Sequence, residues 1–386
     1  MINDKYGYEK GDAVLRTMAE YGVKHTPGFL FGGRIEGDKF GALVSARSRE
    51  EMKSDIATVD ANTPHPVPNV VIKHGIYRIN PKFSVTPQGM YDRATLALQK
   101  IKNQYGVYMA EYNDELRQDL LLKQMILGTA DEALEQKQFQ VYYQPKHDFH
   151  TDRTCGAEGL VRWMHPDIGF MNPILFISLF EQNGFITKMD FYVWEEICKT
   201  LKKWERDGVP VVPVSINVSR RDFEVPDLAG RITALVDSYE IPHEMVHVEV
   251  TESAYSDDPM RITETVKNLH DNGFVIEMDD FGTGYSSLIA LSSMDLDVLK
   301  LDRSIIENDN PGSEKNILEF SMQLAKMLNL KTVAEGVETR EQMERISELG
   351  GDYIQGYYYS KPLPADEFAE YLIRKNTEQN EEKKAD

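Results

Sequence analysis

The sequence predicts an α/β protein in which a closed (β/α)₈ barrel follows a smaller α/β segment. Its 386 residues suffice for two or three domains. Hydrophobic residues make up 41% of the chain, enough to bury a core. From Phe139 onward, short β-branched runs alternate with amphipathic helical segments. About eight such alternations fit in this part, and they predict a parallel sheet that closes into a barrel.

Residues 1–112 are expected to form the smaller segment. Two apolar runs flank a glycine-rich turn and predict a β-hairpin, and helical spacing ends near Gly22. The expected elements are a helix over 11–21, a hairpin of 29–31 and 40–44, a strand over 70–79 and a helix over 91–105.

A charged helix over 113–137 is expected to link this segment to a barrel over 138–374. The charged, apolar-poor tail, 375–386, is expected to fray. The expected barrel strands are 140–143, 156–161, 212–218, 246–250, 275–278, 298–301 and 331–334, and the helices between them include 190–206, 260–272, 313–329 and 339–349.

Composition excludes several classes of protein. With 63 acidic and 43 basic residues, the net charge of -20 opposes non-specific DNA binding. No apolar run approaches the ~20 residues that a membrane helix needs, and the N-terminus lacks a signal-peptide core. Two cysteines, Cys155 and Cys198, provide neither a disulfide framework nor a thiolate zinc site. We therefore expect a cytoplasmic protein with no membrane segment and no DNA partner.

Polar side chains recur where the predicted barrel strands end. The carboxyl ends of parallel barrel strands meet on one face, and carboxylates gathered there stay ionised only around cations or with shifted pKa values. Oxygen ligands favour Mg²⁺ or Mn²⁺, and a pair of such ions suits phosphodiester hydrolysis. Any one acid could instead be a surface or capping residue, but six strand ends together favour a shared centre. These residues are Glu158, Asn217, Glu249, Asp279, Asp280, Lys300, Asp302 and Glu335.

A glycine-rich segment, 280–287, follows the Asp279-Asp280 pair. Its glycines permit a tight turn and a close approach to a ligand. This position favours a mobile active-site loop over an ordinary strand-to-helix connection.

The motifs at these strand ends occur in the order of a known family. The chain resembles the EAL-domain cyclic di-GMP phosphodiesterases over roughly residues 118–374. The matching motifs are Gln144-Pro145, Glu158-Gly159-Leu160-Val161-Arg162-Trp163, Ile216-Asn217-Val218-Ser219, Glu249-Val250-Thr251-Glu252-Ser253, Asp279-Asp280-Phe281-Gly282-Thr283-Gly284, Lys300-Leu301-Asp302, Ala334-Glu335-Gly336-Val337-Glu338-Thr339 and Gln355-Gly356-Tyr357.

The resemblance implies a modified (β/α)₈, TIM-like barrel with one antiparallel strand. It implies hydrolysis of cyclic di-GMP to linear pGpG with two Mg²⁺ or Mn²⁺ ions, in a barrel that pairs as a homodimer. By the same resemblance, Glu158, Asn217, Glu249 and Asp279 hold the first metal, and Asp279 and Asp280 hold the second.

The remaining site residues also receive roles by resemblance. Glu335 is the general base or a second-site ligand, and Lys300 helps to hold the attacking water. Glu252 anchors the loop after Asp280, and Gln355 lines the pocket. The expected substrate-binding residues are Gln144, Arg162 and Asp302.

One departure concerns the signature itself, because Gly159 replaces the family's alanine. Since the liganding Glu158 is kept, we expect an altered rate rather than an inactive site. The alternative is a catalytically weak barrel that acts as a cyclic di-GMP receptor or interaction module. For an interaction module, the helix over 114–137 offers a surface that a partner could bind.

The first segment resembles a degenerate GGDEF diguanylate cyclase domain. The resemblance rests on Ile2–Tyr8, Gly11-Asp12, Glu36–Phe40 and Tyr91–Ala94. Lys39 stands where the family has an acid, the family's first strand is expected before Ile2, and the inhibitory site that would fall at 27–30 is missing. We expect an inert, N-terminally truncated remnant without cyclase activity, although Asn3 and Asp12 match guanine-contacting positions.

Overall fold

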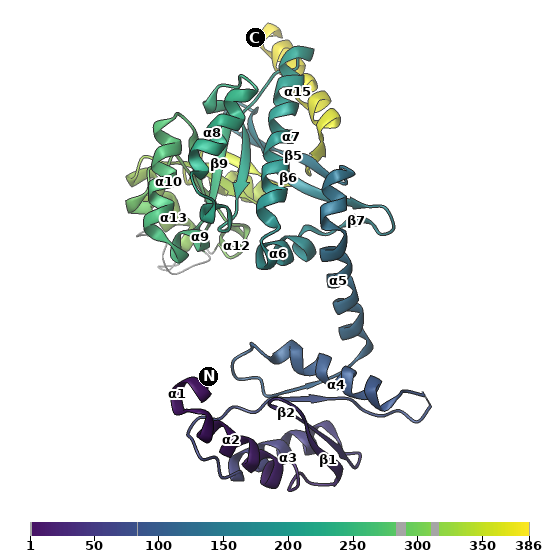
Figure 1. The fold of residues 1–386 in the computed structure, drawn as a ribbon. Helices are drawn as coiled ribbons and strands as arrows, with labels where there is room; N and C mark the ends of the chain where they lie inside the picture. Colours follow the sequence, from purple (N-terminus) through teal and green to yellow (C-terminus); the bar gives the residue numbers. More distant parts are fainter. Residues whose placement is uncertain (1, 83, 283–290, 310–315, 386) are drawn as a thin grey trace. The chain divides into compact units, whose positions relative to one another are not determined.

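The computed structural model describes the chain except residues 1, 83, 283–290, 310–315 and 386 (Figure 1). It divides into two units, Met1–Gln124 and Met125–Asp386. The boundary falls inside helix α5 (Asp114–Glu135), which begins close to the linker helix expected from the sequence. None of the helices in the described part of the chain is long and apolar enough to cross a membrane.

The first unit contains two small sheets in its described residues. The predicted hairpin is present as antiparallel β1 and β2, whereas the expected strand over 70–79 shrinks to three residues that pair in parallel with β4. The elements are α1 (Ile2–Tyr6), α2 (Tyr8–Thr17), a π-helical turn (Met18–Gly22), β1 (Phe29–Glu36), β2 (Lys39–Val44), α3 (Arg49–Asn62), β3 (His74–Ile76), α4 (Pro87–Ile101) and β4 (Met109–Glu111).

The second unit is a closed barrel. The strands follow one another around it in the order β5, β13, β12, β11, β10, β9, β8 and β6, and β6 pairs back with β5. Among the described barrel strands, β5 alone runs antiparallel to its two neighbours, which confirms the modified barrel with one antiparallel strand. Its strands are β5 (Phe139–Asp148), β6 (Arg153–His165), β8 (Val214–Val218), β9 (Val246–Thr251), β10 (Val275–Phe281), β11 (Val298–Leu301), β12 (Lys331–Glu335) and β13 (Tyr353–Gln355).

Helices cover the outside of this barrel (Figure 1). Apolar side chains on the outer faces of the strands pack under them, for example Trp163 against Phe176 and Phe180. The helices are α6 (Pro173–Asn183), α7 (Ile186–Asp207), α8 (Leu228–Ser238), α9 (Glu252–Asp257), α10 (Pro259–Asp271), α12 (Arg303–Glu307), α13 (Ile317–Met327), α14 (Arg340–Glu348) and α15 (Ala365–Ala385), and two short strands, β7 (Gly169–Met171) and β14 (Leu363–Pro364), lie beside β6 and β5.

The charged tail that was expected to fray belongs to a helix. Helix α15 continues from Ala365 to Ala385, so the proposed division after residue 374 cuts through a helix. Buried Phe368, Tyr371 and Leu372 anchor its first half, and the charged residues that follow extend the same helix. A helix that is docked at one end tolerates a polar continuation, which composition alone did not reveal.

Candidate active site at the carboxyl ends of the barrel strands

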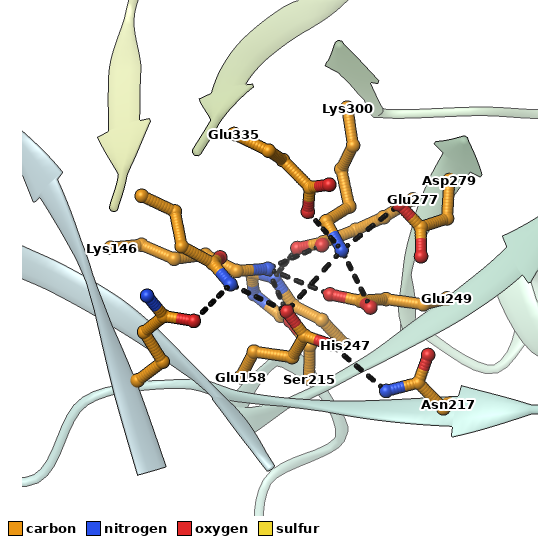
Figure 2. Close-up of polar contacts among 12 residues, drawn as sticks. Lys146, Glu158, Ser215, Asn217, His247, Glu249, Glu277, Asp279, Lys300 and Glu335 are labelled. Atoms are coloured by element: carbon orange, nitrogen blue, oxygen red, sulfur yellow. Dashed lines mark hydrogen bonds and ion pairs between the residues drawn. The ribbon is translucent and has the colours of Figure 1, made fainter. Parts of the chain in front are cut away.

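The strand-end residues expected to form a centre do meet inside the barrel. Side chains alternate between the two faces of a strand, so inward-facing positions on successive strands share one interior. Figure 2 shows Glu158, Asn217, Glu249, Asp279, Lys300 and Glu335 converging from β6, β8, β9, β10, β11 and β12.

Lys300 is the hub of this cluster. Its Nζ lies 2.7 Å from Glu335 Oε1, 2.8 Å from Glu249 Oε2 and 3.1 Å from Asp279 Oδ1. A fourth carboxylate oxygen, Glu158 Oε2, lies at 3.5 Å. Four carboxylates from four strands are therefore gathered around one positive charge (Figure 2).

Amide side chains complete the surroundings of Glu158. Asn217 Nδ2 donates to Glu158 Oε1 at 3.0 Å, and Gln355 Nε2 donates to Glu158 Oε2 at 2.5 Å. The same Gln355 nitrogen lies 3.3 Å from Gln144 Oε1. The structure therefore brings Gln144 and Gln355 to the centre, where the sequence analysis expected them.

Burial and neighbouring charge shift the pKa values of these groups. Burial raises the pKa of Glu249 well above its usual value, and the nearby Glu158 adds to the effect. For Glu158, burial favours a higher pKa, but Lys300, Lys146 and the hydrogen bonds from Asn217 and Gln355 together lower it. Burial raises the pKa of Glu335 to about 8; Lys300 opposes this rise, whereas Asp279 contributes to it. Burial disfavours the charged form of Lys300, but the surrounding carboxylates hold its pKa well above the usual range.

The donor set fits a hard divalent cation. The described residues contain no group of three or more His, Cys, Asp or Glu side chains already arranged as a metal site. However, the cluster around Lys300 offers only carboxylate and amide oxygens as ligands, and it already encloses a cation. Such oxygens are the ligands of Mg²⁺ and Mn²⁺.

Three other predicted residues lie at the rim of this centre. Asp280 is exposed, has a φ of 57°, and donates its backbone N–H to Asp279 Oδ1 at 2.9 Å. Partial burial and the charge of Asp279 raise the pKa of Asp280 to about 6. Asp302 caps helix α12, accepting from the Ser304 N–H at 2.9 Å. Buried Glu252 accepts from the Gly282 N–H at 3.4 Å, at the start of the expected active-site loop, whose residues 283–287 lie outside the described part.

Arg162 shares the inward face of β6 with Glu158, because the two positions differ by four, an even number, along the strand. Its guanidinium lies 5.8 Å from the centroid of the Tyr142 ring, and its Nη1 donates to the Val161 carbonyl. These contacts do not test the expected contact between Arg162 and a substrate phosphate, which stays a prediction.

The sequence analysis missed a second polar layer beneath the first. Lys146, Ser215, His247 and Glu277 are linked there by hydrogen bonds (Figure 2). A signal was present, because Ser215, His247 and Glu277 each precede an expected ligand by two residues. Side chains two positions apart on a strand lie on the same face, so all three of these side chains are expected to point into the barrel with the ligands.

Fold and site together define the class of protein: a (β/α)₈ barrel with an oxygen-donor acidic centre at the carboxyl ends of its strands. The EAL domain model matches residues 128–362, and the chain belongs to the EAL domain family. A second model, diguanylate cyclase, GGDEF domain, matches residues 1–106.

One curated relative aligns with nearly the whole chain, and another with about two thirds of it. The Pseudomonas aeruginosa protein named bifunctional diguanylate cyclase/cyclic di-GMP phosphodiesterase MucR is 29% identical over 95% of this chain and 54% of its own length. The Escherichia coli protein named probable cyclic di-GMP phosphodiesterase PdeN is 36% identical over 64% of this chain and 48% of its own. The chain spans about half the length of the curated relatives it matches.

A solved structure supports the fold assignment. The complex described as PaMucR phosphodiesterase with c-di-GMP is 32% identical, with a TM-score of 0.60. The alignment covers 63% of this chain and 99% of that one. The likeness is therefore confined to a part of this chain of about the size of the EAL barrel.

Proposed function

We propose that the barrel hydrolyses cyclic di-GMP to linear pGpG with two Mg²⁺ or Mn²⁺ ions. The observation that carries the proposal is the gathering of four carboxylates around Lys300, with distances of 2.7–3.5 Å. A buried acidic centre of this kind is costly unless cations occupy it, and it matches the chemistry of phosphodiester hydrolysis.

Glu158, Asn217, Glu249 and Asp279 would hold one ion, and Asp279 and Asp280 the other. When bound, such ions stabilise the negative charge on the attacking and leaving oxygens. Lys300 orients the attacking water from the floor of the site. Arg162, Gln144 and Asp302 would contact the substrate at the rim.

Glu335 would act as the general base. Its carboxylate lies 2.7 Å from Lys300 Nζ, and its raised pKa gives it the proton affinity that a base needs near neutral pH. It takes the proton of the attacking water as the new P–O bond forms. The bond from phosphorus to the 3′-oxygen breaks, and this oxygen takes a proton from bulk water, which leaves a 5′-phosphate and a free 3′-hydroxyl in pGpG.

Three further points belong to this proposal. The relatives named as cyclic di-GMP phosphodiesterases support this substrate, and we place the protein in the cytoplasm. The family resemblance supports a homodimer formed through the barrel, which size-exclusion chromatography with light scattering tests directly. The cyclase-like first unit contributes no second activity.

The test follows the products of cyclic di-GMP by chromatography. The wild type is expected to produce pGpG, and Glu335→Gln to lose at least about 100-fold in turnover, the usual contribution of a general base. Glu338→Gln is a matched control, because this nearby glutamate pairs with Arg303 on the surface. Its rate should equal that of the wild type.

Two results would contradict the proposal. A Glu335→Gln variant with the wild-type rate would remove the base assignment. Intact substrate in the wild type, with binding detected by calorimetry, would make the barrel a receptor.

A further inference from the structure

The second polar layer is centred on Lys146, which comes from the antiparallel strand β5. Its Nζ lies 3.0 Å from Glu249 Oε1, 2.5 Å from Glu277 Oε2 and 2.6 Å from Ser215 Oγ. All three partners stand on other barrel strands. Lys146 therefore joins β5 to β8, β9 and β10 in the interior of the barrel (Figure 2).

Lys146 and Lys300 contact different oxygens of the Glu249 carboxylate. Lys146 contacts Oε1 and Lys300 contacts Oε2, at 3.0 Å and 2.8 Å. Two ammonium groups on different oxygens fix both the position and the rotation of the carboxylate. Oε2 is thereby the oxygen that faces the other three carboxylates around Lys300.

Lys146 is itself held in place. Glu277 accepts from Lys146 through Oε2 and contacts His247 Nδ1 through Oε1, at 2.6 Å. Lys146 is 3% exposed and Glu277 1% exposed. Water therefore does not substitute for either partner, and the charge of one requires the charge of the other.

We propose that Lys146 is a positioning residue for Glu249, and that it holds this ligand in the orientation that metal binding requires. The inference rests on the proposed function, in which Glu249 is a ligand of the first metal. Groups that orient metal ligands by hydrogen bonding typically contribute 10–100-fold to metal affinity.

A purely structural role makes a different prediction. If Lys146 serves only as the counter-ion of Glu277, removing both charges together restores the site. If Lys146 orients Glu249, the double removal restores the fold but leaves Glu249 without its second lysine. The variants Lys146→Met and Lys146→Met/Glu277→Gln separate these roles, because both substitutions keep the side-chain size nearly constant.

The experiment titrates Mn²⁺ into the full chain by calorimetry without nucleotide, and measures melting temperatures in parallel. We expect Lys146→Met to melt lower and the double variant to regain most of that loss. We expect the double variant to bind Mn²⁺ at least about 10-fold more weakly than the wild type. At saturating Mn²⁺, its KM for cyclic di-GMP should remain unchanged.

Lys199→Met is the matched control, since Lys199 also contacts two glutamates, but on the exposed surface of α7. It should change neither Mn²⁺ affinity nor turnover. A double variant that binds Mn²⁺ as tightly as the wild type would overturn the positioning role while leaving the phosphodiesterase intact. A wild type that neither binds Mn²⁺ nor produces pGpG would overturn the proposed function itself, and the inference with it.

Discussion

At the scale of single residues, the structure shows what surrounds Gly159, the glycine that replaces the alanine of the family signature. Gly159 follows inward-facing Glu158 on β6 and therefore points outward, toward α7. A Cβ at this position would lie 2.5 Å from Ile197 Cδ1 and 3.3 Å from the Ser215 carbonyl oxygen. The departure from the family signature therefore concerns the packing of α7 on the barrel, and the oxygen donors of the centre are untouched.

Gly159→Ala is expected to destabilise the protein by about 1–2 kcal/mol, because the added methyl overpacks a buried contact. Ile197→Val removes the clashing methyl and should recover part of this loss in the double variant. Urea unfolding measures the stabilities. Turnover of the single variant should stay within about twofold of the wild type; a tenfold increase would show that the glycine acts on the chemistry.

A pair of buried carboxyl groups predicts a pH dependence of stability. Asp190 and Asp222 lie against each other, and Asp222 Oδ1 is buried without a hydrogen-bond donor among the described residues. Burial, reinforced in Asp190 by its neighbour, raises the pKa of both above the ordinary value. The folded state therefore holds protons that the unfolded chain releases above about pH 4, so this pair loses stability as pH rises.

Asp222→Asn supplies a permanent hydrogen in place of the shared proton, while its carbonyl oxygen still accepts from Ser219. The variant should be at least about 1 kcal/mol more stable than the wild type at pH 8, with a smaller difference at pH 5. Urea unfolding at the two pH values measures this. Equal pH dependence in both proteins would show that the pair does not share a proton.

The residue scale also shows how far sequence reasoning reaches. Glu158, Glu249, Asp279 and Glu335 were identified because each lies within or directly after a short apolar run, a pattern that composition and alternation expose. Lys146 was noted only as a departure from the family, which usually has an apolar residue after Gln144-Pro145, and it received no role, because position along an antiparallel strand does not indicate depth in the barrel. The contact with Glu249 depends on which strands lie next to one another in the barrel, and only the folded structure shows this.

At the scale of elements, a buried polar contact helps to fix helix α15 to β5. His147 Nε2 and the Tyr371 hydroxyl are 2.5 Å apart, and the His147 ring stacks on Tyr359 at 4.0 Å. Burial lowers the pKa of His147 to about 4, so the ring is neutral at pH 7. Its Nδ1 is buried without a partner among the described residues, so the tyrosine is the ring's hydrogen-bond partner there.

Tyr371→Phe should destabilise the protein by about 1–3 kcal/mol, since it leaves a buried ring nitrogen unsatisfied. Tyr359→Phe is the matched control, because it keeps the stacked ring; its effect should stay below about 0.5 kcal/mol. Both are measured by urea unfolding. Equal effects of the two variants would contradict this account of how α15 is attached.

The elements also show where prediction from sequence stops. Long alternating runs such as 246–251 and 275–281 were identified close to their true bounds. Strand β13, only Tyr353–Gln355, was missed because three residues carry no readable period, although it closes the barrel between β12 and β5. The presence of one antiparallel strand followed only from the family resemblance, which did not say which strand it is, because strand direction leaves no mark in local composition.

At the scale of the whole molecule, the first unit carries a hairpin that resembles the signature turn of the cyclase family. Lys39 Nζ lies 2.6 Å from Glu36 Oε1 across the turn between β1 and β2, and both side chains are exposed. A cation thus stands at the position where the resembling family has a carboxylate.

We expect the full chain to form no cyclic di-GMP from GTP with Mg²⁺ or Mn²⁺, because that cation opposes metal binding at the hairpin. Chromatography of the nucleotide products measures this. Glu335→Gln is the suitable background, because it prevents product from being consumed by the barrel. Accumulation of cyclic di-GMP in this variant would contradict the prediction that the first unit has no cyclase activity.

The central claim for the molecule is that its buried acids form a metal-dependent phosphodiester centre. The most direct test measures the initial rate of pGpG formation as Mn²⁺ is added to protein freed of metal with EDTA. We predict no turnover without metal. As Mn²⁺ is added, the rate should rise to saturation, and its dependence on Mn²⁺ concentration should be steeper than the binding curve of a single ion. Turnover in EDTA, or intact cyclic di-GMP at saturating Mn²⁺, would contradict the account.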